Sequence, residues 1–368
     1  MQVLHFLKKN IVLTVSLCAA LITSFIVKPD RAYLGYYDLK TLTCLFCVLA
    51  VICAFRNIHF FYIMAEKMVQ HLPNTRLAVL ALVYITFIGS MLITNDTALL
   101  AFLPLSYFVL HATRNDKYLA FTFIMQNCAA NLGGMLTPFG NPQNLFLYTK
   151  FNIPTNQFLL IMLPPFLISM ALITVCCLFV KPEPLTIPDE PARTDPKRAM
   201  IYAALFALAV TIVLRALPYW IGLAVIPTTL FFVDRTALKK VDYPLLLTFA
   251  AFFTFSGNMA RMESVQQLFS MLLQKNTLLF SALSCQVISN VPAAILLSQF
   301  TTDYASLLQG VNIGGAGTLI ASLASLITFK EYTRHEPRKR GRFILLFSVV
   351  NFAFLFILLL AQTLINTL

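Results

Sequence analysis

Long apolar stretches recur along the whole chain, from residue 11 to residue 364, and short polar segments separate them. Stretches rich in Leu, Ile, Phe and Ala that can cross about 30 Å of hydrocarbon predict membrane-spanning helices. The strands of a membrane barrel are segments of about ten residues in which apolar and polar side chains alternate, and these stretches lack that alternation. The expected spans are residues 11–27, 41–55, 118–148, 157–180, 200–217, 219–234, 244–257, 304–329 and 343–364. The predicted fold class is an all-α polytopic membrane protein.

Two further apolar segments, residues 77–111 and 276–300, each carry a polar break at the middle. Each therefore predicts a hairpin of two helices that leaves the membrane on the side it entered, in a re-entrant arrangement. The residue types at the breaks are those that cap the start of a helix, and a buried helix N-terminus offers free N–H groups to an oxyanion. We expect the solute to bind at Thr94, Asn95, Asp96, Thr97, Ser289, Asn290, Val291 and Pro292.

The chain contains an internal repeat. The windows 131–146 (NLGGMLTPFGNPQNLF) and 312–327 (NIGGAGTLIASLASLI) share Asn, Gly, Gly, Thr and Leu at identical offsets. Each window follows a hairpin, and each hairpin follows a span and an amphipathic stretch, residues 57–72 and 258–274. One additional span, 200–217, precedes the second set, so the two repeats are predicted to be inverted. Inverted repeats with discontinuous helices are typical of secondary transporters.

The repeats predict three parts of the chain: residues 1–180, a proline-rich and charged cytoplasmic linker at 181–199, and residues 200–368. Half of the 12 glycines fall in the two windows, so the spans 118–148 and 304–329 are expected to be discontinuous. Unwound backbone at membrane depth lines a cavity or is buried in protein, and its carbonyls can bind a cation. An alternative is that the paired glycines only allow helices to pack closely. The candidate cation-binding residues are Asn131, Gly134, Thr137, Gly140, Asn141, Asn312, Gly315 and Thr318.

Asp96 is the only acidic residue within the apolar body of either hairpin. Carboxylates inside a membrane are costly and usually serve ion or proton coupling. If the first hairpin instead spans the membrane completely, Asp96 lies at the outer surface and has no such role.

Composition agrees with the hydrophobic pattern. The chain is 59% hydrophobic and 11% charged, with a mean hydropathy of +0.79, which excludes a soluble globular protein. Its net charge of +12 reports membrane orientation, because most Lys and Arg fall on the side of Lys8 and Lys9. The N-terminus is therefore expected in the cytoplasm, and nucleic acid is not an expected partner. The eight cysteines lie in apolar runs and the five histidines are scattered, so we expect no disulfide framework and no metal beyond a possible Na⁺.

The runs TNDTALLAFLPL, NLGGMLTPFGNPQNLFLY, SNVPAAILL and NIGGAGTLIASLASLI resemble one ion-transporter superfamily. It contains citrate transporters, arsenite permeases, divalent-anion:sodium symporters and one type of sodium/proton antiporter. The resemblance implies a homodimer, an elevator-like motion, a solute held between the two hairpin tips, and cations at the carbonyls of residues 134–141 and 315–321. The chain departs from the Ser-Asn-Thr tips of the symporters, because Asp96 and Val291 replace the third residue. An ionised Asp96 would repel a dianion, whereas a protonated Asp96 or a neutral solute such as arsenous acid removes that conflict.

These features predict an ion-coupled secondary active transporter, driven by Na⁺ or H⁺. It would carry a small anion or oxyanion, such as a di- or tricarboxylate or arsenite, by alternating access. The alternative is a sodium/proton antiporter without an organic substrate. An intramembrane protease needs two apposed carboxylates, or a Ser with a His at membrane depth, and the sequence offers neither, so no enzyme activity is expected. The expected location is a bacterial or archaeal plasma membrane, with lipid as a partner and no cofactor except Na⁺ as a possible coupling ion.

Overall fold

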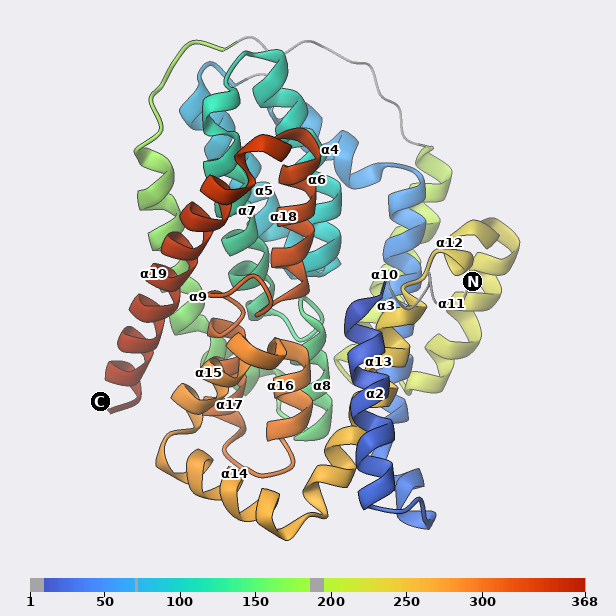
Figure 1. The fold of residues 1–368 in the computed structure, drawn as a ribbon. Coiled ribbons are helices and arrows are strands. Elements are labelled where there is room, and N and C mark those ends of the chain that lie inside the picture. Colours follow the sequence, from blue (N-terminus) through green and yellow to red (C-terminus); the bar gives the residue numbers. More distant parts are fainter. Residues whose placement is uncertain (1–9, 70–71, 186–194, 368) are drawn as a thin grey trace.

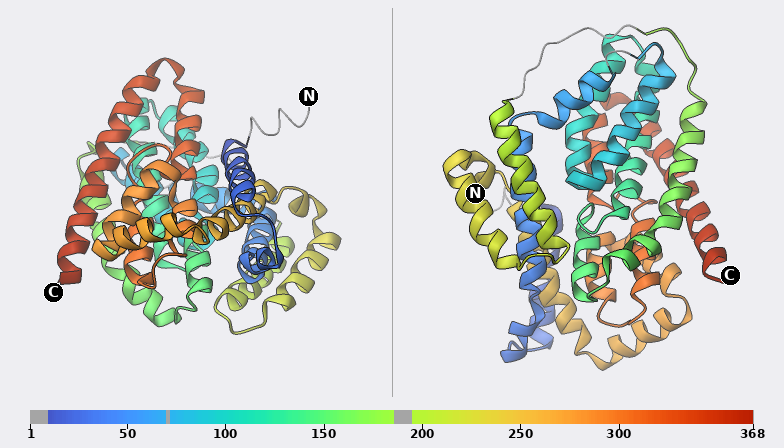
Figure 2. Two further views of the ribbon diagram at one scale, coloured as in Figure 1. Left: turned by 60° about the horizontal axis from the view of Figure 1, so that its bottom comes forward. Right: turned by 180° about the vertical axis from the view of Figure 1, so that it is seen from behind.

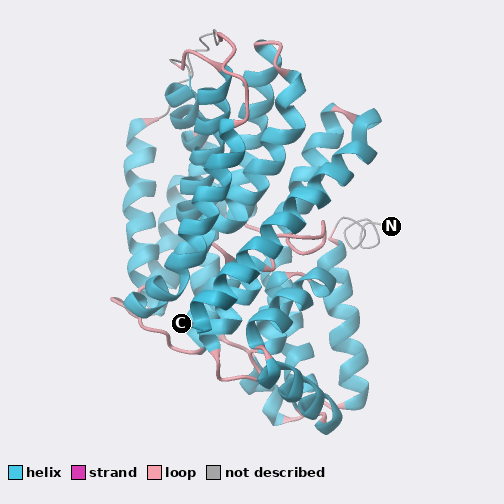
Figure 3. Ribbon diagram, turned by 90° about the vertical axis from the view of Figure 1, so that its left-hand side faces the viewer, coloured by secondary structure: helices cyan, strands magenta, loops and turns pink. Residues whose placement is uncertain are grey.

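The computed structural model describes residues 10–69, 72–185 and 195–367, where the regular elements are helices (Figure 3). Two predictions fall outside these ranges: Lys8 and Lys9 as an anchor, and residues 186–194 of the linker. In the described part, five helices are long and apolar enough to cross a membrane: Leu39–Asn57, Thr75–Ile93, Thr155–Leu178, Pro196–Val213 and Pro337–Thr367. Shorter apolar helices are Ile11–Ile26, Tyr219–Val233 and Thr277–Ile288. The protein is therefore an all-α integral membrane protein, as its hydrophobic pattern predicts.

The helices form two groups that stand side by side (Figure 1). We call the smaller one the scaffold group. Its elements are α2 (Ile11–Ile26), η1 (Arg31–Tyr36), α3 (Leu39–Asn57), α10 (Pro196–Val213), α11 (Tyr219–Val233), α12 (Arg235–Lys239) and α13 (Tyr243–Ala260). Within it, α2 lies along α13, and α10, α11 and α12 pack on α3.

The larger group, which we call the site group, contains both hairpins and both interrupted helices. Its elements are α5 (Thr75–Ile93), α6 (Asn95–Ala112), η2 (Asp116–Tyr118), α7 (Leu119–Gly133), η3 (Gly134–Leu136), α8 (Pro142–Lys150), α9 (Thr155–Leu178), α15 (Thr277–Ile288), α16 (Asn290–Leu297), α17 (Tyr304–Ile313), α18 (Leu323–His335), η4 (Pro337–Lys339) and α19 (Arg340–Thr367). Two arms, α4 (Phe60–Val69) and α14 (Glu263–Lys275), connect the groups, and α14 crosses the lower end of the molecule (Figures 1 and 2).

The two hairpins enter the site group from opposite ends (Figure 1). Hairpin 1 is α5 and α6, and hairpin 2 is α15 and α16. Equivalent elements make equivalent contacts: α5 packs on α7 as α15 packs on α17. The returning helix of each hairpin packs on the second half of the other repeat's interrupted helix, α6 on α18 and α16 on α8. Helix α7 lies at the centre and is buried on all sides from Thr122 to Gly133, which explains why its sequence has no charged residue.

The first helix of each hairpin begins at the dipeptide Asn-Thr. The side chain of Asn74 accepts a hydrogen bond from the backbone N–H of Leu77, and that of Asn276 accepts one from Leu279. These N-caps satisfy N–H groups that have no partner inside the helix. The same short signal therefore fixes where both hairpins start.

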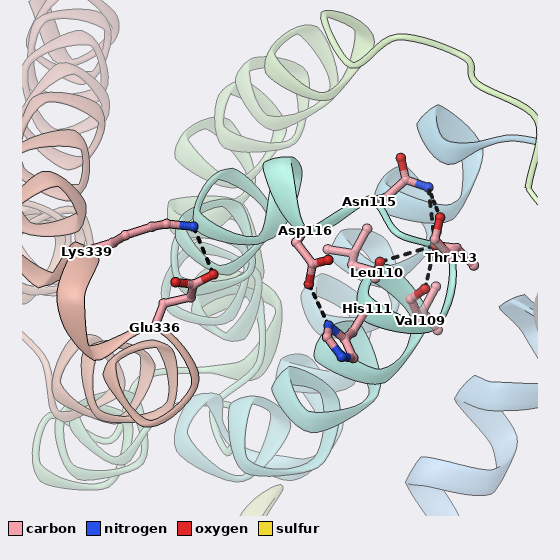
Figure 4. Close-up of polar contacts among 8 residues, drawn as sticks. All are labelled: Val109, Leu110, His111, Thr113, Asn115, Asp116, Glu336 and Lys339. Atoms are coloured by element: carbon pink, nitrogen blue, oxygen red, sulfur yellow. Dashed lines mark hydrogen bonds and ion pairs between the residues drawn. The ribbon is translucent and has the colours of Figure 1, made fainter.

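The base of hairpin 1 is closed by local polar contacts (Figure 4). Thr113 Oγ1 donates to the carbonyl of Val109 at 2.7 Å, and Asn115 Nδ2 donates to the carbonyl of Thr113 at 3.1 Å. The His111 ring lies 2.8 Å from the Asp116 carboxylate. The chain can therefore turn sharply from α6 into η2 and α7.

The element boundaries differ from those expected in a few places. The arm expected at 57–72 is the shorter helix α4, and residues 258–260 of the second expected arm belong to α13. The second interrupted helix is open over nine residues between Ile313 and Leu323, whereas a short η3 turn occupies part of the break in the first. The returning helix α16 ends at Leu297, because the chain turns there toward Asp303, which caps α17.

Candidate functional site

The two hairpin tips have the same unusual backbone conformation. Thr94 has φ +71° and ψ 150°, and Ser289 has φ +73° and ψ 157°. Residues other than glycine rarely adopt positive φ, and such strain persists only where surrounding contacts over-determine it. Those contacts are matched as well: the N–H of Asn95 donates to the Gly140 carbonyl at 3.1 Å, and that of Asn290 donates to the Ala321 carbonyl at 2.9 Å.

The next residue in each tip is also fixed in an equivalent way. The N–H of Asp96 donates to Asn95 Oδ1, and the N–H of Val291 donates to Asn290 Oδ1, both at 2.9 Å. These bonds settle the orientation of both side-chain amides, because each Oδ1 accepts and each Nδ2 must then point elsewhere.

The interrupted helices break where the sequence predicts. In the first, a Cβ at Gly140 would lie 2.3 Å from the Gly134 carbonyl oxygen, so only glycine permits this approach. In the second, Gly317 has φ +121°, and a Cβ there would lie 2.1 Å from Gln286 Oε1. The glycines therefore allow the loops to close tightly on neighbouring polar groups.

The carbonyls of both loops are held by side-chain amides. Asn144 Nδ2 donates to the carbonyls of residues 134, 135 and 137, at 3.3, 3.1 and 3.1 Å. In the second loop, Gln286 Nε2 donates to the carbonyls of Gly314 at 2.8 Å and Ala316 at 3.0 Å. Several of the loop carbonyls therefore already accept a hydrogen bond from a side-chain amide.

The predicted threonines hold each loop to its hairpin. Thr137 Oγ1 donates to the Met91 carbonyl at 2.6 Å, and Thr318 Oγ1 donates to the Gln286 carbonyl at 3.1 Å. The oxygen lone pairs of both hydroxyls can still accept from a ligand or bind an ion.

Side chains from both repeats meet between the broken helices. Asn131 Oδ1 accepts from Asn95 Nδ2 at 3.2 Å and from Ser322 Oγ at 2.8 Å. Asn312 Oδ1 accepts from Asn141 Nδ2 at 3.2 Å and from Gln143 Nε2 at 3.1 Å. We call these residues the amide cluster: Asn95, Asn131, Asn141, Gln143, Asn144, Asn290, Asn312 and Ser322.

The tips converge on this cluster near Gly315. A Cβ built there would lie 3.3 Å from Asn290 Nδ2 and 3.6 Å from Asn131 Oδ1, the atom to which Asn95 donates. The structure therefore brings the Asn side chains of the two tips together with Asn131 and Gly315 in one buried place. Thr97 lies one turn into α6, where it accepts from the Thr94 hydroxyl at 3.2 Å, and Pro292 is buried in the first turn of α16.

The site is rich in oxygen and poor in positive charge. Residues 94–97, 131–144, 289–292 and 312–325 include no Lys or Arg. Asp96 Oδ1 is buried without a hydrogen-bond partner among the described residues, as are Asn141 Oδ1 and Gln143 Oε1. Buried acceptors without donors are costly, so these atoms are suited to bind a proton donor or a cation.

Four residues that organise the site are absent from the sequence-based set: Gln143, Asn144, Gln286 and Ser322. Asn144 and Gln143 belong to the run GNPQN, and Gln286 is an isolated Gln in an apolar helix three residues before Ser289. An isolated amide in an apolar helix is a usable signal, because a buried polar side chain requires a partner.

The chain is similar to known transporters over nearly its whole length. The profile described as citrate transporter matches residues 3–324. An uncharacterized transporter of Methanocaldococcus jannaschii is 32% identical over 336 residues, 90% of this chain and 91% of the relative. Inner membrane protein YbiR of Escherichia coli is 27% identical over 277 residues, 74% of each chain. A silicon efflux transporter of Oryza sativa subsp. japonica is 29% identical over 164 residues, 44% of this chain and 33% of the relative. Because the family profile and the relatives match over this length, the chain belongs to the citrate transporter family of integral membrane transporters.

Proposed function

We propose that the protein is an ion-coupled secondary active transporter that binds a small oxygen-rich solute between its two hairpin tips. The observation that carries the proposal is the convergence of the tips: two strained helix starts from opposite ends meet at one buried amide cluster. Helix starts and amides at membrane depth offer hydrogen bonds to oxygen atoms, and a site between two inverted hairpins can open alternately to either side.

The chemistry of the site favours a weak oxyacid in its undissociated form over a di- or trianion. No Lys or Arg is present in the tips and loops to balance a multiple negative charge, and Asp96 adds a carboxylate beside them. Hydroxyl groups of an undissociated acid can donate to unpartnered oxygens such as Asp96 Oδ1 and accept from amide N–H groups. The rice relative is named as a silicon efflux transporter, which is compatible with this solute class.

Coupling is proposed to involve Asp96. Its Oδ1 is buried and unpartnered, whereas several loop carbonyls expected to bind Na⁺ already accept from Asn144 or Gln286. A proton on Asp96 removes both the buried charge and the unpaired acceptor. We therefore propose H⁺ as the first coupling ion to test, with Na⁺ as the second.

The test is uptake into proteoliposomes. Arsenite, silicate and citrate are supplied separately under a proton gradient, a sodium gradient or neither. Uptake of arsenite or silicate that requires an ion gradient is expected, together with at least about tenfold slower uptake in Asn95→Ala and in Asn290→Ala. Gln299→Ala, at an exposed amide beyond the end of α16, is the matched control. Unchanged uptake in both Asn variants would exclude the tips as the solute site.

The same unpartnered carboxylate favours one second candidate, a sodium/proton antiporter without an organic substrate. It predicts sodium-driven proton movement, followed by a pH-sensitive dye inside the vesicles, when no oxyacid is present. Proton movement that appears only after arsenite or silicate is added would reject the antiporter.

A further inference from the structure

The two repeats share one cross-repeat contact in the amide cluster and differ in a second. The residue that starts the second half of each broken helix donates to the Asn of the other repeat: Ser322 to Asn131, and Asn141 to Asn312. The second donor differs. Asn131 Oδ1 receives it from the tip residue Asn95, whereas Asn312 Oδ1 receives it from Gln143 on α8.

The sequence explains this difference. At the offset where the first repeat has Gln143, the second has Ala324, which cannot donate from its side chain. Gln143 thus occupies the acceptor that hairpin 2 would use if the repeats were equivalent. Asn290 Nδ2 donates no hydrogen bond to the described residues, although Asn290 is only 3% exposed. Its Oδ1 is engaged by the Val291 N–H, so turning the amide over would cost that bond.

We propose that the tips have different roles: Asn290 is the amide that donates to the solute, and Asn95 is a positioning residue that holds Asn131. Gln143 sets the difference by occupying Asn312. The identity of the ligand in this inference rests on the proposed function. The assignment of different roles to the two tips rests on the amide geometry alone. The group that Asn290 takes is a solute oxygen with a free lone pair, at the N-terminal end of α16.

The binding experiment uses purified full-length protein in nanodiscs titrated with arsenite by calorimetry. Asn290→Ala is expected to weaken binding about tenfold or more, as loss of one donor to a buried ligand predicts. Gln143→Ala is also expected to weaken binding, because Asn290 can then pair with Asn312. In the double variant Gln143→Ala/Asn290→Ala, affinity should equal that of Asn290→Ala alone. Additive losses of affinity would overturn the role assigned to Gln143, and full affinity in Asn290→Ala would overturn that of Asn290.

The second experiment needs no ligand, so it remains decisive if arsenite fails to bind and the proposed solute class is wrong. Thermal unfolding is measured for the single and double variants without solute. Both Asn95→Ala and Asn290→Ala lose the equivalent bond from the N–H of the next residue. Asn95→Ala should lower the midpoint further, because Asn131 also loses a buried donor. In the Gln143→Ala background, Asn290→Ala should lower the midpoint more than it does in the wild-type background. Equal falls for Asn95→Ala and Asn290→Ala in the wild-type background would overturn the proposal.

Discussion

Thr94 and Ser289 hold a backbone conformation that is otherwise nearly confined to glycine. The cost of such a conformation is about 1–3 kcal/mol at each residue. Backbone bonds from Asn95 and Asn290 to the loop carbonyls of Gly140 and Ala321 hold the strain in place. At the scale of single residues, the site is therefore built by contacts that lie outside the tips.

Relief of this strain is a testable consequence. Ser289→Gly and Ser289→Ala both remove the hydroxyl, whose contacts are long, at 3.3 and 3.4 Å, but only glycine relaxes the backbone. We expect Ser289→Gly to be more stable than Ser289→Ala by about 1–2 kcal/mol in chemical unfolding. Equal stability of the two variants would mean that the positive φ carries no strain.

Asp96 gives a second prediction. If its buried carboxylate carries the coupling proton, Asp96→Asn keeps the shape but cannot titrate. Uptake driven by a pH gradient should be lost, while exchange of labelled for unlabelled arsenite across the membrane continues. Glu263→Gln, an exposed carboxylate at the start of α14, serves as control. Uptake by Asp96→Asn that still follows the pH gradient would contradict the role.

The sequence predicts residues of this site unevenly. Asn95 and Asn290 can be found because a polar break inside an apolar run is visible along the chain. Asn144 and Gln286 are visible as polar residues, but the sequence does not show which carbonyls they hold, because those carbonyls lie about ten or thirty residues away. The local sequence pattern shows where a polar residue lies along the chain, but only the fold shows which groups it hydrogen-bonds.

At the scale of elements, hydrophobic pattern and glycine content together predict two hairpins and two interrupted helices at the positions where the structure has them. The sequence does not predict which helices these elements pack against. The packing of α6 on α18 and of α16 on α8 crosses between the repeats, and helical periodicity contains no information about which helix faces which. Tyr107 of α6, stacked on His335 of α18 with ring centroids 3.5 Å apart, is one such contact that sequence cannot supply.

The loop of the first interrupted helix gives an element-scale prediction. In Gly140→Ala the new methyl would meet the Gly134 carbonyl oxygen at 2.3 Å, so the loop must open and release the Asn95 N–H. We expect a loss of at least about 2 kcal/mol in unfolding free energy and a loss of uptake. Gly341→Ala is the matched control, because a Cβ at that position would meet nothing within 4 Å beyond its chain neighbours and the nearby backbone of its own helix. Equal stability of the two variants would show that close approach of the loop is not required.

At the scale of the whole molecule, the scaffold group meets the site group where α13 packs on α16 and α3 packs on α8. Aromatic pairs cross this boundary, with Phe146 and Phe253 at 5.6 Å and Phe139 and Phe206 at 6.2 Å between ring centroids. The arrangement into two groups was not predicted from the sequence, because apolar surfaces facing lipid and apolar surfaces facing another helix have the same composition.

Arg215 provides a polar contact across the boundary. From the turn after α10, its guanidinium donates to the carbonyls of Ile153, at 3.0 Å, and Tyr148, and stacks on the Tyr148 ring at 4.0 Å. These carbonyls lie just at the C-terminal end of α8, where a positive charge is favourable. Any sliding of the site group along the scaffold has to break these bonds.

We therefore expect Arg215→Met to favour positions of the site group relative to the scaffold group other than the one described. The readout is the distance distribution between spin labels at Lys150 and Trp220, both exposed, measured by pulsed electron paramagnetic resonance. Arg235→Met is the control, because Arg235 stacks on Phe231 of its own group. A second or broader distance peak is expected for Arg215→Met alone, and identical distributions in all three proteins would contradict a restraining role.

The amides that hold the loop carbonyls have a consequence for how an ion could enter. At either loop, a cation would meet carbonyl oxygens that already accept hydrogen bonds from Asn144 or Gln286. Binding would then be an exchange: the ion loses its hydrating water, and the amide leaves the carbonyls and becomes hydrated. Selectivity among ions would then depend on the free energy that each ion needs to displace the amide from the carbonyls. This free energy would matter more than the ionic radius.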